Sequence, residues 1–535
     1  MLDGDAEPGP STTARLSRAT AAMATGTLLS RVTGFAKLAA LSYALGIKSP
    51  LADAYNLANA TPNIVFDLII GGVLAGTVVP VFVERLARRD EEGAWGDISA
   101  VLSLAAVVLL AATAALVVLA PLVIRVYTAG GAHGHLAAEQ SAATLLLRLF
   151  APQVAAYGLI GLLTAVLNAR RRFAAPMFVP IANNVLVIGV YLAVHALFPK
   201  PGLVQAAHDP TLLLLLGAGT TGGVVLQALL LVPSLRGVVP VLPRRRSVQV
   251  AAPLPDLGRS LSPRSGDAWD RLERLGRMAA PAGRPGLRWR WEPRNEAVRS
   301  ILRLSGWTFG FVVANQVAYV IVLRLALVVA GTGGISSYTY AYTFFQLPFG
   351  IVAVSIMSAV QPELAERWVR GDLAGFGRRA NAGLRAVVVA AIPPAVGYLV
   401  LAGPVTALVL ARGAGTLSGA RETAAVLVGF AVGLPGFCAY LFLGSAFQAI
   451  QDTRTIFGYY IVENGLNVLL AYLLSPFLGA QGLAIALSIA YTVAALLAGA
   501  GLRRRLSQPA MASGAGGAGG AGGLRLPGVG GAGGA

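Results

Sequence analysis

Two basic side chains, Arg31 and Lys37, lie inside an apolar run that begins near Ala19 and continues past Leu45. An ionisable group near the centre of a membrane-spanning helix costs at least about 2.5–3.5 kcal/mol, so it usually faces a cavity or a partner. Six residues turn a helix by roughly 240°, which places these two cations at depth but on different sides. Paired cations in a hydrated cavity are suited to an anionic head group such as a phosphate.

The next apolar run carries a polar stripe. Asn56, Asn59 and Asn63 are spaced i, i+3, i+7 and share one helix face, while Asp53 opens the run and Asp67 follows the stripe. Two interpretations are open. The amides bind a polar cargo together with the cations of the first run, or they hydrogen-bond neighbouring helices while the lysine of that run pairs with one of the aspartates.

A second polar group lies in the C-terminal part of the chain. Asn315 lies in one apolar run, and Glu463 and Asn467 lie at i, i+4 in another, where they share a face. A carboxylate with several amide oxygens is suited to holding Na⁺ or carrying a proton. The alternative is a salt bridge between Glu463 and Arg324, because buried charges are usually paired.

No metal or nucleotide site is predicted. His133 and His135 are spaced i, i+2 in a small-residue loop without nearby Cys or carboxylates, which indicates a plain loop. The sequence contains no GxxxxGK[ST] phosphate-binding loop. Cys438 is the single cysteine, so it cannot form an intramolecular disulfide.

The composition identifies the elements that must position these groups. Of 535 residues, 56% are hydrophobic and 12% are charged. Soluble domains have about 25% charged residues, and disordered chains have low hydrophobicity, so both classes are excluded. An all-α polytopic membrane protein remains. Twelve runs are long enough to span a bilayer, near 20–47, 55–86, 98–128, 140–169, 174–198, 211–235, 299–331, 336–366, 376–411, 419–450, 455–476 and 480–502.

The connecting loops alternate in charge. One set carries most of the arginines, whereas the other contains only Lys48, Lys200, Arg412 and Arg421. Because basic residues gather on cytoplasmic loops, both termini and the central loop are predicted to be cytoplasmic. This distribution accounts for most of the net charge of +18 without a nucleic-acid partner.

The central loop 236–298 separates two sets of six spans. It contains the run RWRWEPR from Arg288, in which Trp289 and Trp291 alternate with arginines. This run is suited to an anionic lipid surface, and a solvated linker is the alternative interpretation.

Short motifs recur between the two halves at nearly constant offsets. PVFVERLAR from Pro80 matches PELAERWVR from Pro362, and Asn184 matches Asn464, with offsets of 282 and 280 residues. An even number of spans per half keeps both halves in the same orientation, so the repeat predicts two parallel six-helix halves around a central cavity, as in transporters. The expected organisation is a cytoplasmic tail 1–18, a first bundle 19–235, a basic linker 236–298, a second bundle 299–505 and a disordered Gly/Ala-rich tail 506–535.

Several motifs in order resemble one family. They are SRVTGFAK from residue 30, ADAYNLANATPN from residue 52, AVLNARRRFAAPMFVPIANN from residue 165, LPFGIVAVSIMSAVQPELA from residue 347 and QAIQDTRT from residue 448, together with the Pro80 motif. Over roughly residues 20–505 the chain resembles the MurJ/MviN family of lipid II flippases. This family belongs to the multidrug/oligosaccharidyl-lipid/polysaccharide exporter superfamily.

The resemblance implies translocation of an undecaprenyl-pyrophosphate-linked peptidoglycan precursor from the inner to the outer leaflet of the bacterial cytoplasmic membrane. It implies that Arg31 lines the central cavity, that Lys37 replaces a second arginine, and that Asp53 matches a family aspartate. With the polar residues above, the predicted substrate-binding set is Arg31, Lys37, Asp53, Asn59, Asn63 and Gln346. The predicted ion-binding set is Asn315, Glu463 and Asn467.

The chain departs from the family pattern at three charged positions. Phe66 replaces an arginine, and Thr343 and Gln346 replace an arginine and a glutamate of the eighth span. Family members also often have fourteen spans, against the twelve predicted here.

Transport makes and breaks no covalent bond, so the chain is predicted to be a non-enzyme without a bound cofactor, driven by the membrane potential or by Na⁺ or H⁺ as coupling ion. Its predicted partners are the lipid-linked precursor, membrane lipids and proteins of cell-wall synthesis. The alternatives are a flippase for another lipid-linked glycan, a drug exporter, a membrane glycosyltransferase, or a non-transporting scaffold that recruits the peptidoglycan machinery through 236–298.

Overall fold

The computed structural model describes residues 12–71, 82, 91–130, 136–170, 172, 174–198, 201–235, 288–292, 294–304 and 306–507. Within these ranges all regular structure is helical. Several predictions fall outside them: the Pro80 motif, the loop with His133 and His135, most of the linker 236–298, residues 1–11 of the first tail and residues 508–535 of the last.

Three helices of the first half begin with a proline. Pro50, Pro152 and Pro210 occupy first-turn positions, where a missing amide proton costs nothing, and Asp209 accepts a hydrogen bond from the Thr211 amide at 2.9 Å. The elements are α1 (Thr12–Leu45), α2 (Pro50–Phe66), the π-helix η1 (Asp67–Gly71), α4 (Glu91–Thr128), α5 (Leu136–Phe150), α6 (Pro152–Ala169), α7 (Ala174–Leu197), α8 (Leu203–His208), α9 (Pro210–Leu231) and η3 (Pro233–Leu235).

The second half begins after the linker. Its two longest single helices are capped by side chains: Asp372 accepts from the Gly375 amide at 2.7 Å, and Thr416 accepts from the Gly419 amide at 3.2 Å. The elements are α11 (Glu296–Leu304), α12 (Gly306–Val328), α13 (Gly334–Pro348), the π-helix η5 (Phe349–Ala353), α14 (Val354–Val369), α15 (Leu373–Leu410), α16 (Leu417–Ala449) and α17 (Thr453–Ser507).

The sequence repeat is also a repeat of helices. Helices α4 and α15 each contain 38 residues, and α15 begins 282 residues after α4. The two π-helical segments also begin 282 residues apart, at Asp67 and Phe349. They follow α2 in the first half and α13 in the second, and π-helical turns often occur at functional sites.

Helix α17 is a hairpin rather than one long helix. Gly479, with φ 55° and ψ −136°, breaks it between the predicted spans 455–476 and 480–502. Arg505 Nη2 lies 2.6 Å from Asp452 Oδ2. A straight helix would separate residues this far apart in sequence by about 75 Å or more, so the second arm must turn back along the first.

Eight helices of the described part are long and apolar enough to cross a membrane, or up to nine if the pair α13 and α14, bent by 46°, is one span. Large apolar side chains such as Val118 and Phe477 are 72% and 86% exposed, as expected for surfaces that face lipid. The chain is therefore a multi-span membrane protein, while the count of twelve spans stays a prediction.

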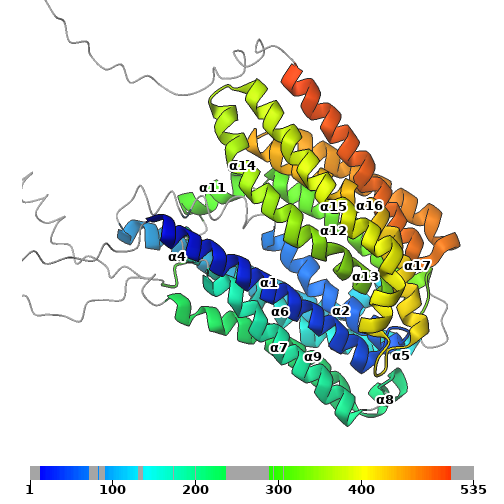
Figure 1. The fold of residues 1–535 in the computed structure, drawn as a ribbon. Coiled ribbons are helices and arrows are strands. Elements are labelled where there is room, and N and C mark those ends of the chain that lie inside the picture. The colour runs from blue at the N-terminus through cyan, green and yellow to red at the C-terminus, as the bar shows by residue number, and fades with distance from the viewer. Residues whose placement is uncertain are drawn as a thin grey trace, which may run out of the picture.

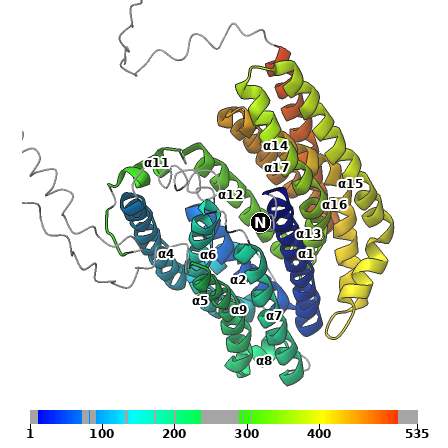
Figure 2. The same cartoon turned by 60° about the vertical axis from the view of Figure 1, so that its left-hand side comes forward.

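The helices gather in two bundles (Figure 1). Helices α4, α5, α6, α7 and α9 lie on one side, and α14, α15, α16 and α17 lie on the other. The bundles converge at the end where α1 finishes and α8 lies, and they diverge toward the end where α1 begins (Figure 2). We call these the converged end and the diverged end.

Candidate functional site

A cavity of about 390 Å³ lies where α1, α2 and α7 of the first half meet α13 of the second. We name it the basic cavity, because Arg31 and Lys37 line it. Asn59, Thr343 and Gln346 line it as well. Four of the six predicted substrate-binding residues, from two helices of one half and one of the other, therefore share one cavity.

The two cations of the basic cavity have no anionic partner among the described side chains. Arg31 is exposed and Lys37 half-buried. The carboxylates of Asp53 and Asp67, which the sequence offered as partners of Lys37, bond elsewhere. The cations thus remain available to a ligand.

Arg31 reaches across the cavity to the second half. A Cβ atom added to Gly350 of η5 would lie 3.1 Å from Arg31 Cζ. The guanidinium therefore lies against a backbone position that has no side chain, which leaves its donors free for a carboxylate or phosphate.

Asp53 lies outside the basic cavity and is fully buried at the start of α2. Its Oδ2 accepts from the Gly333 amide at 2.5 Å, and its Oδ1 accepts from the Ser336 amide at 3.0 Å and from Ser336 Oγ at 2.7 Å. The carboxylate therefore caps the N-terminus of α13, where backbone amides and the helix dipole favour a negative charge. We name this contact the Asp53 latch.

Other contacts join the halves around the latch. Lys48 Nζ lies 3.0 Å from Glu422 Oε2, Ser42 Oγ donates to the Leu410 carbonyl at 3.1 Å, and the Ala414 amide donates to the Tyr43 carbonyl at 2.8 Å. All of them join the end of α1, or the turn between α1 and α2, to the second half. They hold the two bundles together at the converged end.

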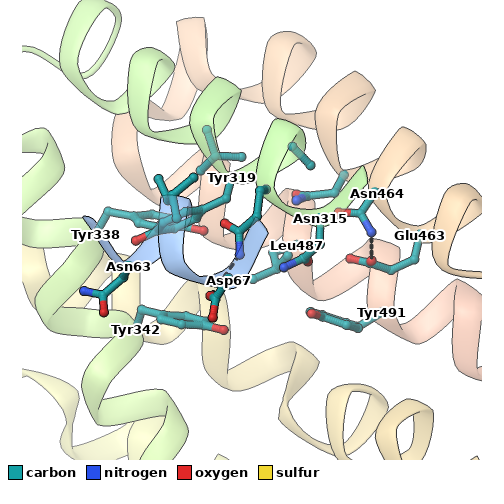
Figure 3. A pocket seen from close by; sticks show the side chains of 15 residues that line it. Asn63, Asp67, Asn315, Tyr319, Tyr338, Tyr342, Glu463, Asn464, Leu487 and Tyr491 are labelled. Atoms are coloured by element: carbon teal, nitrogen blue, oxygen red, sulfur yellow. Dashed lines mark hydrogen bonds between the residues drawn. The ribbon is translucent and has the colours of Figure 1, made fainter. Parts of the chain in front are cut away.

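A second cavity, of about 200 Å³, lies between α12, α13 and α17 of the second half and α2 of the first. We name it the acidic cavity, because Asp67 and Glu463 line it. The three predicted ion-binding residues all line it, and so does Asn63, which was predicted to bind substrate. The full polar lining is Asn63, Asp67, Asn315, Gln316, Tyr319, Tyr338, Tyr342, Glu463, Asn464, Asn467 and Tyr491 (Figure 3).

The two carboxylates of the acidic cavity are bonded to amides. Gln316 Nε2 donates to Asp67 Oδ2 at 3.0 Å, and Asn464 Nδ2 donates to Glu463 Oε2 at 2.7 Å (Figure 3). Asn467 Oδ1 is buried without a hydrogen-bond partner among the described residues. A buried, unpaired amide oxygen beside a carboxylate is a suitable ligand for Na⁺.

The alternative pairing of Glu463 with Arg324 is not formed. Arg324 Nη2 donates instead to the Ala129 carbonyl at 2.8 Å, at the end of α4. The two residues lie on helices that meet, but Glu463 shares the acidic cavity with Asn315, which lies nine residues before Arg324 on α12. The carboxylate therefore remains inside the acidic cavity.

Helices α2 and α13 separate the two cavities. Thr339 and Thr343 of α13 face the basic cavity, whereas Tyr338 and Tyr342 of the same helix face the acidic one. Because α1, α2 and α7 are the repeat mates of α12, α13 and the first arm of α17, the two cavities occupy equivalent places in the two halves. One cavity is lined by basic side chains and the other by acidic ones.

The missing family charges fall in different places. Thr343 and Gln346 line the basic cavity, and the Thr343 hydroxyl donates to the Thr339 carbonyl at 2.9 Å. Phe66 packs on Tyr157, with ring centroids 6.0 Å apart. In the described part of the chain, no group of three or more His, Cys, Asp or Glu side chains is placed to hold a metal ion.

Sequence reasoning missed Asp67 as a member of the acidic cavity and the latch role of Asp53. The repeat offset was a signal for the latch role of Asp53, because Gly333 follows Asp53 by 280 residues and lies directly before an expected helix. For Asp67, the signal was its position four residues after Asn63, which continues the polar helix face.

Comparison with known proteins gives a consistent result. A probable lipid II flippase MurJ of Rhizobium meliloti (strain 1021) is 26% identical over 478 residues, which cover 88% of this chain and 77% of that protein. A solved structure titled lipid II flippase MurJ, inward closed conformation, superposes with a TM-score of 0.67 at 19% identity, covering 90% of this chain and 87% of that one.

A multidrug resistance MATE family transporter in an inward-facing conformation superposes with a TM-score of 0.66 at 16% identity, covering 89% of this chain and 94% of that one. These two structures confirm the expected transporter fold. The model of the family described as lipid II flippase MurJ matches residues 41–515. The chain therefore belongs to the lipid II flippase MurJ family.

Proposed function

We propose that this protein is a flippase that moves undecaprenyl-pyrophosphate-linked peptidoglycan precursor, lipid II, from the inner to the outer leaflet. The single observation that carries the proposal is the basic cavity. Arg31 and Lys37 both line this cavity, and neither has an anionic partner among the described residues. A pyrophosphate supplies the missing charges, and the amides of Asn59 and Gln346 suit the polar sugar and peptide.

The proposed location is the bacterial cytoplasmic membrane, with both termini on the cytoplasmic side. The alternation of basic loops supports this orientation. The diverged end, where α1 begins, then faces the cytoplasm, and the Asp53 latch closes the outer side. Both solved structures described above are in inward conformations, which supports an inward-facing state here.

Transport then proceeds by alternating access. The head group enters the basic cavity from the cytoplasmic side while the lipid tail stays in the bilayer. Opening of the latch, with closure of the diverged end, exposes the same cavity to the outside. An inside-negative potential drives an anionic head group outward, which is favourable by about 2.3 kcal/mol per charge per 100 mV.

We further propose that the acidic cavity binds the coupling ion, Na⁺ or H⁺. Glu463, Asn315 and Asn467 supply the ligands, with Asp67 joining from the first half. Because Asp67 begins η1, directly after α2, and Glu463 is on α17, an ion bound between them contacts both bundles. Its binding therefore depends on how the bundles are arranged, which is the requirement for coupling.

The test is complementation with a lipid readout. The chain is expressed in a bacterium depleted of its own lipid II flippase, and the appearance of lipid II in the outer leaflet is measured. Rescue is expected from the wild type and loss of rescue from Arg31→Ala, while Arg125→Ala, an exposed arginine outside the cavity, serves as the matched control.

Failure of the wild type, with the protein shown to be in the membrane, would overturn the cargo assignment. It would favour another lipid-linked glycan or a scaffold for proteins of cell-wall synthesis. Deletion within 236–287 separates these two, because a scaffold acting through the linker loses its function and a flippase keeps it.

A further inference from the structure

A short extended segment of the linker, Arg288–Glu292, lies along α4; we name it the strap. The Arg288 amide donates to Ser99 Oγ at 3.1 Å, and the Arg290 amide donates to Ser103 Oγ at 2.9 Å. Two residues of extended chain advance about 6.6 Å, and four residues of helix advance about 6 Å. The alternate amides of the strap therefore match serines one helical turn apart, which fixes its register.

The extended conformation sorts the side chains of the strap into two sets. Successive side chains of an extended segment point to opposite sides, so Trp289 and Trp291 share one side and the arginines share the other. The two indoles are 68% and 55% exposed. Arg290 Nε lies 2.6 Å from Glu292 Oε1, whereas Arg288 has no side-chain partner among the described residues.

An apolar groove of about 450 Å³ begins at the strap and runs between α4 and α6. Leu110 and Leu159 of its lining are 60% and 40% exposed, so the groove opens on a surface that faces lipid. Its polar members, Ser99, Ser103 and Arg288, all lie at the strap end. The remaining lining is Leu102, Ala106, Leu109, Leu110, Ala155, Leu159, Leu162, Leu163 and Trp289.

We propose that this groove is a binding site for an anionic glycerophospholipid of the surrounding bilayer. One acyl chain lies along the leucines between α4 and α6, and the phosphate lies at the Arg288 guanidinium, which has no partner in the described part of the chain. Trp289 and Trp291 lie among the neighbouring head groups, where indole rings are favoured at a membrane interface. The site fastens the strap to α4 and to the bilayer at once.

The cargo is not the occupant that these observations favour. The groove and the basic cavity share no lining residue. The groove opens sideways to the bilayer, next to one cation, whereas the cargo's pyrophosphate is matched by two cations inside the bundle. A resident phospholipid therefore fits the groove independently of what the protein transports.

The site is tested with the full chain purified in mild detergent. The protein is incubated with an equal mixture of phosphatidylglycerol and phosphatidylcholine of the same acyl chains, and native mass spectrometry counts the lipids that remain bound. The wild type is expected to retain phosphatidylglycerol preferentially. Arg288→Gln is expected to lower that preference about fivefold, the contribution of one basic residue at an anionic surface.

Two further variants make the test specific. Arg294→Gln removes an exposed charge close to the strap that does not line the groove, and it is expected to keep the preference. Ala155→Trp fills the groove and is expected to remove the retained lipid whatever its head group. Equal preference in Arg288→Gln and Arg294→Gln, or unchanged retention in Ala155→Trp, would overturn the proposal.

Discussion

The Asp53 carboxylate accepts a hydrogen bond at 2.5 Å from the amide of Gly333, the residue 280 positions further along the chain. This separation equals the offset of the sequence repeat. Residues equivalent by the repeat can touch only close to the axis that relates the two halves. Asn56 Nδ2 and Ser336 Oγ, 3.0 Å apart, are a second pair with the same separation. The latch therefore lies on the axis.

The latch is expected to contribute substantially to stability. Asp53→Ala removes the acceptor of three hydrogen bonds and leaves two buried amides unpaired, which should lower the free energy of unfolding by about 3 kcal/mol. Ser336→Ala removes one of these bonds and also the bond from Asn56 Nδ2, and should cost about 2 kcal/mol. Thermal unfolding of the purified proteins measures this: the midpoint should be lowest for Asp53→Ala, higher for Ser336→Ala and highest for the wild type. A midpoint for Asp53→Ala equal to that of the wild type would contradict the role of the latch.

The charge of Lys37 is expected to matter more than its shape. Lys37→Gln should reduce outer-leaflet lipid II at least tenfold in flippase-depleted cells, because the pyrophosphate loses one of two cations. Lys37→Arg should retain most activity, because it keeps the charge at the same place in the basic cavity. If both variants support growth equally, the lysine does not bind the head group.

The acidic cavity predicts a separable defect. Glu463→Gln is expected to abolish the dependence of transport on a Na⁺ or H⁺ gradient while leaving binding of lipid II to purified protein unchanged, because the two cavities share no lining residue. Asn467→Ala should shift the ion concentration for half-maximal transport upward. Glu366→Gln, on an exposed pair with Arg370, is the matched control. Loss of lipid II binding in Glu463→Gln would contradict separate roles.

The break in α17 is expected to require glycine. Gly479 has φ 55° and ψ −136°, a backbone region that is closed to residues with a side chain. Gly479→Ala should therefore destabilise the protein by about 1–3 kcal/mol. Gly458→Ala, in the same element with open space around its Cβ position, should be neutral or slightly stabilising. Equal thermal midpoints for the two variants would mean that the hairpin does not depend on this residue.

The strap is expected to stay attached to α4 down to mildly acidic pH. Hydrogen bonds from the Arg290 and Asn295 side chains hold the pKa of Glu292 below its ordinary range. A lowered carboxyl pKa contributes stability above the unfolded pKa, near 4.5, which is lost as the pH falls through the lowered value. Glu292→Gln should therefore speed tryptic cleavage at the neighbouring arginines at neutral pH, whereas the wild type should be equally protected at about pH 8 and pH 6. Unchanged cleavage in Glu292→Gln would contradict this anchoring.

Much of the fold was predictable because it follows from hydropathy and repetition. The apolar runs predicted the helices. The recurring motifs predicted that the two halves are equivalent, and the equal lengths of α4 and α15 agree with this. The grouping of Arg31 with Lys37 was predictable as well, since two charges at membrane depth on one helix are expected to face a polar cavity.

The division of polar residues between two cavities was not predictable from spacing. Asn59 and Asn63 share a face, but one residue lines the basic cavity and the other the acidic cavity. Position along the helix decides this outcome, together with the π-helical turn that follows at Asp67. Likewise, Glu463 and Arg324 have opposite charges and could have formed a pair. The structure places Glu463 beside Asn315 in the acidic cavity and Arg324 beside the Ala129 carbonyl.

The latch on the axis also bears on how such a protein can arise. An assembly of two identical six-helix chains would place the same residue on both sides of the axis, so an aspartate would face an aspartate and repel it. Here one copy supplies a carboxylate at Asp53, and the other supplies free amides at Gly333 and Ser336. This contact can form only when the two copies have different sequences, as in this fused chain. A symmetric homodimeric ancestor would have needed other contacts to hold its two halves together at this end.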